Sequence, residues 1–211
     1  MAGHRRWTRA ELAGPVLDVA PLLLGSLLVH GPVALRITEV EAYAGTDDPG
    51  SHAFRGPTPR TQVMFGPAGH LYCYFSYGMH WAANVVTGEA GRASAVLLRA
   101  GEVVRGDEVA RERRQRARRS ASVVTDRELA RGPGNLARAV GLGREQDGLD
   151  LCAAGAPAYL THPEPASRAP VVRRGPRVGV SGEGGSGRRY PWRFWLDDEP
   201  TVSTYRAAVR R

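Results

Sequence analysis

Two pairs of short apolar segments, each pair joined by a tight turn, constrain the fold of this chain more than any other feature. Residues 27–30 and 33–43 flank Gly31-Pro32, and residues 70–75 and 81–86 flank Tyr77-Gly78-Met79. Short apolar segments separated by such turns are typical of β-hairpins. The sequence therefore predicts a fold built on antiparallel strand pairs.

The remaining segments predict a single α+β domain. Residues 93–99, 149–160, 170–180 and 191–196 are expected to be extended, and residues 17–24, 107–119 and 136–140 to be helical. Residues 46–67 and 181–187 are expected to be loops, and a loop as long as the first is usually functional. We expect a curved, mainly antiparallel β-sheet core with peripheral helices over residues 17–205. Residues 1–16 are expected to be a mobile segment, frayed over 1–12, and residues 206–211 a tail.

The composition excludes several classes of protein. Of the 211 residues, 42% are hydrophobic and 24% charged, which is ordinary for a globular protein. No apolar segment approaches the ~20 residues of a membrane span, and residues 20–29 are too short for a convincing signal peptide. Cys73 and Cys152 form neither a disulfide framework nor a zinc site, and the histidines lack metal-ligand spacing. We expect a cytoplasmic protein without a membrane or metal partner.

The charge favours a polyanionic partner. The net charge is +8, which is typical of proteins that bind nucleic acid and is also found on inert basic surfaces. All 29 basic residues are arginine. Since the chain has no lysine, no side-chain amine can form a Schiff base, and the α-amino group of Met1 is the only amine available.

A carboxylate pair lies near the end of the second predicted strand. Strict alternation places Ile37, Glu39, Glu41 and Tyr43 on one face and the residues between them on the other. Two alternatives follow from this pattern. The face is either an exposed polar surface, or it holds a carboxylate on a rigid strand beside an aromatic ring.

Tyrosines cluster on the next predicted hairpin. Alternation places Tyr72 and Tyr74 on one face and Leu71, Cys73 and Phe75 in the core. The two rings are either ordinary strand residues or a stacking platform for a base. Tyr77 and Met79 at the turn could act as a wedge between base steps. A loop of odd length would put Asn84 of the return strand on the tyrosine face.

Three further features of the sequence each have two interpretations. His52 in the long loop is either exposed or a ligand contact. Arg99 ends an apolar strand and needs an anion, for which either a phosphate or Glu41 would serve. The arginines of residues 107–119 and the Gly132-Pro133-Gly134-Asn135 turn form either a solvated surface or phosphate contacts.

Taken in order, these residues resemble the alkyladenine (3-methyladenine) DNA glycosylase family, as a bacterial member. The matching segments cover roughly residues 17–204. They are Ile37-Thr38-Glu39-Val40-Glu41-Ala42-Tyr43-Ala44-Gly45, Asp47-Asp48, Ser51-His52, Thr58-Pro59-Arg60, Met64-Phe65, Gly69 to Met79, Asn84, Val96 to Ala100, Asp126 to Leu129, Gly132 to Leu136, Arg177-Val178-Gly179-Val180 and Pro191 to Trp195. The Glu-Ala-Tyr and Tyr-Gly-Met segments at this spacing are highly specific.

The resemblance implies a function and a site. It implies a base-excision-repair enzyme that flips 3-methyladenine, 7-methylguanine, hypoxanthine or ethenoadenine out of duplex DNA and hydrolyses the N-glycosidic bond. By this resemblance Glu41 is the general base, while Arg99 and the carbonyl of Val180 contact the nucleophilic water. Tyr43, His52 and Tyr74 form the base pocket, and Asn84 rejects guanine. Tyr77 intercalates, and Met79 and His80 contact DNA.

The resemblance implies an enzyme that needs no cofactor, and the absence of lysine predicts a monofunctional enzyme without a lyase step. We also expect a monomer associated with the nucleoid. Two rival hypotheses remain. A non-catalytic nucleic-acid-binding module would use the tyrosines for stacking alone. An unrelated hydrolase would use Glu39 and Glu41 as an equal pair.

Overall fold

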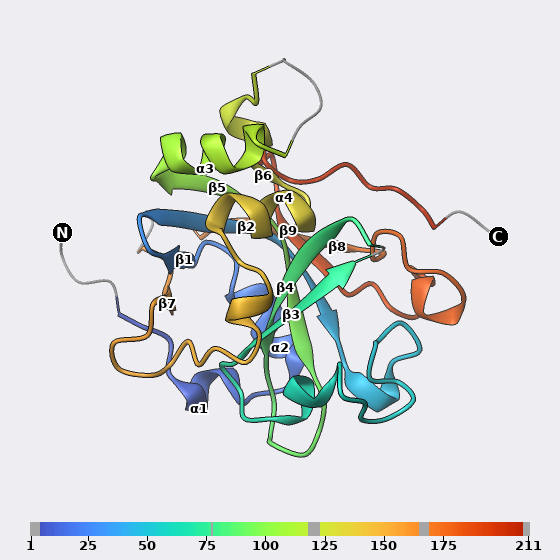
Figure 1. Ribbon diagram of the computed structural model, residues 1–211. Coiled ribbons are helices and arrows are strands. Elements are labelled where there is room, and N and C mark those ends of the chain that lie inside the picture. Colours follow the sequence, from blue (N-terminus) through green and yellow to red (C-terminus); the bar gives the residue numbers. More distant parts are fainter. Residues whose placement is uncertain (1–4, 77, 118–122, 165–168, 209–211) are drawn as a thin grey trace.

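The computed structural model describes residues 5–76, 78–117, 123–164 and 169–208. Its strands form one antiparallel sheet in the order β3-β4-β5-β2-β1-β7, which does not close into a barrel (Figure 1). β6 pairs with β5, and β9 joins β2 to β8. The strands are β1 (Leu27–His30), β2 (Val33–Tyr43), β3 (Leu71–Ser76), β4 (His80–Val86), β5 (Ala95–Arg105), β6 (Ala130–Arg131), β7 (Ala158–Thr161), β8 (Val172–Gly175) and β9 (Arg193–Leu196).

Four short α-helices accompany these strands in the described part of the chain and confirm the α+β class. They are α1 (Arg9–Leu12), α2 (Val16–Leu22), α3 (Asp107–Gln115) and α4 (Pro133–Val140). α4 packs on β4 and β5 and against α3 (Figure 1). It begins three residues before the predicted start, because Pro133 at its first turn has a backbone angle suited to a helix. α3 ends at Gln115, short of the predicted Arg119, and residues 118–122 lie outside the described part.

Residues 5–12 are packed, in contrast to the expectation that residues 1–12 are frayed, and residues 1–4 lie outside the described part. Trp7 is 5% exposed, its indole N–H donates to Ser26 Oγ at 3.0 Å, and its ring stacks on His162 at 4.1 Å. Leu12 is completely buried. Residues 5–12 read as polar, but their few apolar side chains reach the core.

A β-bulge in β2 changes which residues face the core. Val33, Leu35 and Ile37 belong to the main core cluster, and so do Val40 and Ala42. The ladder with β5 is interrupted between Ile37 and Val40, where Thr38 on β2 and Arg99 on β5 are both left without a partner in the register. Strict alternation wrongly grouped Ile37 with the carboxylates. After the bulge, the predicted face of Glu39, Glu41 and Tyr43 is confirmed opposite the core residues.

The β3–β4 hairpin has the register that an odd-length turn produces. Tyr72 pairs with Asn84, and Tyr74 with Ala82, so Asn84 shares the tyrosine face as expected. Phe75 was predicted to be core, but it is 47% exposed and lies against Trp81 with ring centroids 5.4 Å apart. The end of the hairpin extends past the core, so its outer residues are exposed.

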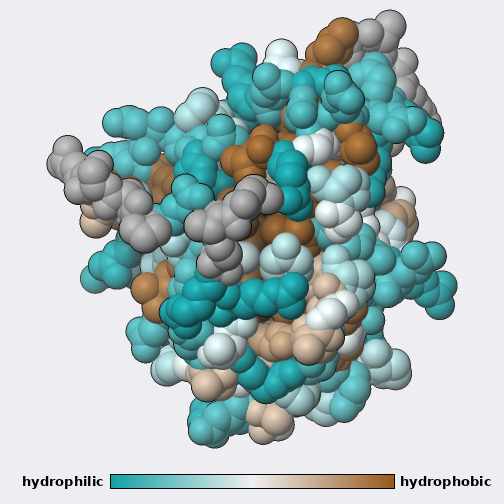
Figure 2. Space-filling model, turned by 90° about the vertical axis from the view of Figure 1, so that its left-hand side faces the viewer, coloured by the Kyte–Doolittle hydropathy of each residue, from teal (hydrophilic) through white to brown (hydrophobic). Residues whose placement is uncertain are grey.

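The surface on the side of β7 is mainly hydrophilic, with small apolar patches between the polar side chains (Figure 2). Among the described residues, no helix is long and apolar enough to cross a membrane.

Candidate active site

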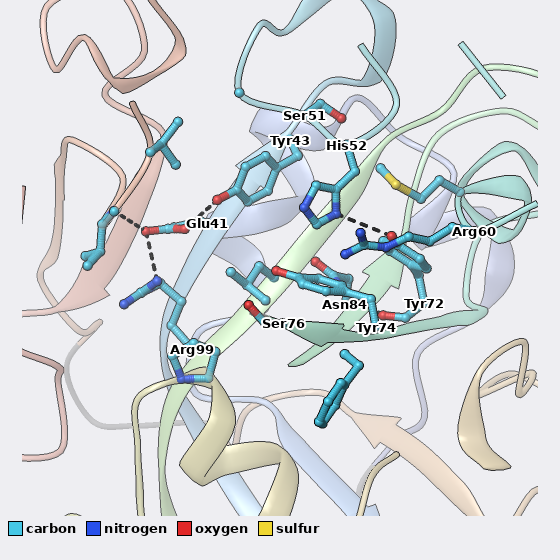
Figure 3. A pocket seen from close by; sticks show the side chains of 18 of the residues that line it. Glu41, Tyr43, Ser51, His52, Arg60, Tyr72, Tyr74, Ser76, Asn84 and Arg99 are labelled. Atoms are coloured by element: carbon cyan, nitrogen blue, oxygen red, sulfur yellow. Dashed lines mark hydrogen bonds and ion pairs between the residues drawn. The ribbon is translucent and has the colours of Figure 1, made fainter. Parts of the chain in front are cut away.

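A cavity of about 530 Å³ opens between the end of β2 and the β3–β4 hairpin (Figure 3). Its walls come from six parts of the chain: the end of β2, the long loop, the hairpin, β5, the start of α4 and the segment after β8. Carboxylate, aromatic and amide groups line it together. The predicted residues that line this cavity are Glu41, Tyr43, His52, Tyr74, His80, Asn84, Arg99 and Val180.

Glu41 is held at the cavity wall by three donors. The Tyr43 hydroxyl donates to Oε2 at 2.8 Å, the Val178 backbone N–H donates to Oε1 at 2.7 Å, and Arg99 Nη1 lies 3.2 Å from Oε1. The side chain is otherwise buried among protein atoms. Charge-assisted bonds of this kind fix both oxygens of a carboxylate. The arrangement suits a group that accepts a proton from a water in the cavity.

Glu39 has a different role, although it is also buried. It accepts bonds from Arg99 Nε at 2.8 Å, Arg193 Nε at 2.6 Å, and both the backbone N–H and hydroxyl of Ser203 at 2.7 and 2.9 Å. Burial raises the pKa of Glu39, but the charges of Arg99 and Arg193 and the Ser203 bonds outweigh this and leave it below its ordinary value. Glu39 does not line the cavity. It holds Arg99 in place from behind.

Arg99 and Tyr43 are fixed in the protonation states that this arrangement needs. Burial lowers the pKa of Arg99, but the charges of Glu41 and Glu39 outweigh it and raise the pKa above its ordinary value. Burial and the charge of Glu41 raise the pKa of Tyr43 well above its ordinary value. The guanidinium therefore stays charged, and the phenol keeps the proton that it donates.

His52 and Tyr74 form an aromatic corner of the cavity. Their ring centroids are 4.5 Å apart at 84°. Tyr72 lies behind them, 1% exposed, with its hydroxyl 3.3 Å from His52 Nδ1. Burial, with a contribution from the charge of Arg60, lowers the pKa of His52. The imidazole is therefore neutral near pH 7, and the corner presents uncharged aromatic surface.

Asn84 is oriented by the backbone. Its side-chain amide donates to the carbonyl of Tyr72 at 2.9 Å, and the residue is only 4% exposed. The hydrogen bond fixes the amide of Asn84 at the cavity wall, so a molecule bound in the cavity would meet this buried polar group in one orientation.

The remaining predicted residues lie around the hairpin turn and after β8. Met79 is 65% exposed, and Tyr77 lies outside the described residues. Val180 lines the cavity, while its carbonyl oxygen faces the Gly-rich loop, since a Cβ on Gly185 would lie 2.0 Å from it. These positions leave the predicted roles of the three residues as predictions.

Among the lining residues that sequence reasoning missed, Arg60 and the Val178 backbone make specific contacts. Arg60 lies over the ring of Tyr74, 5.2 Å from its centroid. The Val178 N–H bonds Glu41, and a backbone donor carries no side-chain signal in a sequence. Arg60 had a signal, because it closes the Thr58-Pro59-Arg60 segment. Among the described residues, no group of three His, Cys, Asp or Glu side chains could hold a metal ion.

Residues 10–200 match the family described as Methylpurine-DNA glycosylase (MPG). A relative from Streptomyces avermitilis is 56% identical over 209 residues, which covers 97% of this chain and 93% of the relative. One from Leifsonia xyli subsp. xyli is 55% identical over 195 residues, covering 90% and 88%. One from Cutibacterium acnes is 48% identical over 196 residues, covering 92% and 97%. All three carry the name 3-methyladenine DNA glycosylase as a provisional assignment.

Proposed function

Because the chain belongs to the methylpurine-DNA glycosylase family, and is therefore a hydrolase of the N-glycosidic bond in DNA, we propose that it excises damaged purines with a water activated by Glu41. The observation that carries this proposal is the position of Glu41: a carboxylate with both oxygens fixed, at the wall of an aromatic cavity. The substrates are 3-methyladenine, 7-methylguanine, hypoxanthine and ethenoadenine in duplex DNA.

The cavity receives the base after it leaves the helix. A base inside a duplex cannot be attacked, so it is flipped out at a cost of about a few kcal/mol. Tyr43, Tyr74 and His52 line a space of about 530 Å³, which is ample for a purine. A cationic methylated purine gains about 0.5–2 kcal/mol from an aromatic face. Neutral His52 adds no repulsion, and Tyr77 fills the gap left in the duplex.

Hydrolysis follows from the contacts of Glu41. The bond between the sugar C1′ and the base breaks, and the base leaves with the electron pair. The water oxygen bonds to the electron-poor C1′, and the water proton passes to Glu41. Arg99 orients the water, and the Val180 carbonyl, which lies beside Gly185 of the Gly-rich loop, is its second expected contact. Arg99 and the other two donors hold both oxygens of Glu41 in place before the attack.

We further propose that the enzyme is monofunctional and acts as a monomer on nucleoid DNA. The net charge of +8 supports binding to the phosphate backbone. Met79 and His80, near the hairpin turn, contact the DNA beside the flipped base.

Base release from duplexes that each carry one defined lesion tests this proposal. We expect the free base and an intact abasic strand from each of the four lesions, and background release from undamaged duplex. Tight binding of lesion duplexes without release of any base would instead support the non-catalytic module. Release from a Glu41→Gln variant at the wild-type rate would contradict the role of Glu41.

A further inference from the structure

Arg177, in the segment after β8, forms a completely buried ion pair. Its Nη1 and Nη2 donate to the two carboxylate oxygens of Asp48 at 2.5 and 2.7 Å, and both side chains are 0% exposed. The two residues are 129 positions apart in the chain. A buried ion pair adds little net stability, because desolvation of both charges offsets their attraction. Such a pair instead fixes the positions of its two side chains relative to each other.

The guanidinium joins three segments of the site. Nη1 also donates to the carbonyl of Ala42 at 3.0 Å, and Nη2 to the carbonyl of Gly184 at 2.8 Å. Its central carbon lies 4.5 Å from the centroid of the Tyr43 ring. The fit is close, since a Cβ on Gly50 would lie 2.3 Å from Nη2. The end of β2, the long loop and the Gly-rich loop are therefore fastened together at one side chain.

Two of the three donors to Glu41 depend on this junction. The Tyr43 hydroxyl belongs to the ring on which the guanidinium rests, and the Val178 N–H belongs to the next residue after Arg177. Arg177 itself does not line the cavity. We infer that Arg177, paired with Asp48, is a positioning residue that holds Tyr43 and the Val178 N–H against the carboxylate of Glu41. This inference rests on the proposed function of Glu41.

Arg177→Lys is the main test, because lysine keeps the charge but cannot make the forked contact with Asp48. The single-turnover rate of 7-methylguanine release should fall about 10- to 100-fold, the usual cost of a misplaced reacting group. The dissociation constant for the lesion duplex, measured in a Glu41→Gln background to prevent release, should change much less than the rate. A parallel change in rate and affinity, or an unchanged rate, would overturn the inference.

Asp48→Asn is a second test variant that keeps the side-chain volume. It should likewise lower the single-turnover rate much more than it changes the dissociation constant for the lesion duplex. Melting curves accompany both variants. If neither variant folds, the pair serves stability and the inference fails. Arg173→Lys is the matched control, since Arg173 on β8 forms an exposed ion pair with Asp197 at 2.7 Å and should release base at the wild-type rate.

A double-mutant comparison tests whether Arg177 affects the rate through Tyr43. If Arg177 acts through Tyr43, then Arg177→Lys should cost a smaller factor in a Tyr43→Phe background than in the wild type, because interacting residues are not additive. Equal factors in both backgrounds would overturn this route. Failure of the wild-type protein to release any lesion base would contradict the proposed function instead, which keeps the two failures distinct.

Discussion

At the scale of single residues, Glu41 and Glu39 are two residues apart on one strand and differ in almost every contact. Glu41→Gln should keep lesion binding but lose about 10²–10⁴-fold in single-turnover rate, the usual contribution of a general base. Glu39→Gln should mainly lower the melting temperature, because it removes the charge that faces Arg99 and Arg193. Comparable rate losses in the two variants, at equal melting temperatures, would instead support the rival hypothesis of an unrelated hydrolase that uses Glu39 and Glu41 equally.

Asn84 gives a prediction about which bases are excluded. Guanine differs from hypoxanthine by a 2-amino group, and a side chain fixed against that edge can exclude it at about 1–3 kcal/mol. Asn84→Ala removes the fixed amide, so the variant should release undamaged guanine slowly while still releasing 7-methylguanine. Base release from undamaged and lesion duplexes, followed by chromatography, measures both. Guanine release at background level would leave Asn84 a structural role only.

The individual residues of the site were easier to predict than the contacts that hold them. Glu41, Tyr43 and Tyr74 stand out by residue type and strand alternation, and all three line the cavity. Arg177 and Asp48 both lie in segments that resemble the family, but neither residue type nor strand alternation predicts that they pair with each other. A partner 129 positions away cannot be found from local pattern.

At the scale of elements, the capping of α1 predicts how the stability of the fold changes with pH. Thr8 caps the helix, and its backbone N–H donates to the Glu11 carboxylate at 2.8 Å. This bond, helped by Arg5, lowers the pKa of Glu11 to about 2 against the opposing effect of burial. Because the folded pKa lies below the unfolded one, the carboxylate stabilises the fold above about pH 4.3 and stops doing so as the pH falls toward 2.

Glu11→Gln isolates this effect, because glutamine can keep the capping geometry and does not titrate. At pH 7 the variant should melt about 2–4 °C lower than wild type, because a neutral amide oxygen accepts weaker hydrogen bonds than a carboxylate does. The difference should shrink as the pH falls from about 4.3 to about 2. Thermal melts across this range measure it, and a difference that stayed constant with pH would contradict the assignment to Glu11.

Elements were predictable where local pattern and tertiary structure agree. β1, β2 and both hairpin turns follow from apolar alternation between turn residues, and their predicted bounds match closely. β5 was predicted to end at Arg99 but continues to Arg105, because pairing with the long β2 extends it through a weakly apolar segment. The 149–160 segment becomes a strand only from Ala158, where β1 offers a partner.

At the scale of the whole molecule, the absence of lysine makes a prediction about the product. A glycosylase that cuts the strand attacks the sugar with an amine, and this chain offers only the α-amino group of its first residue. Incubation with a lesion duplex and borohydride should therefore trap no protein–DNA adduct on a denaturing gel. The abasic strand should break only after alkali. An adduct formed at the rate of base release would contradict the water mechanism.

The bulge in β2 also has a consequence for how such an enzyme can diverge. The strand carries its core residues at odd numbers up to Ile37 and at even numbers from Val40. Ile37 pairs with Gly101 and Val40 with Leu98, so each strand takes three steps across the irregularity. Loss of Thr38 alone would leave β5 one residue longer than β2 there and put the two strands out of register on one side. A single-codon insertion or deletion in β2 therefore needs a matching change in β5, so the strands that carry Glu41 and Arg99 can change length only together.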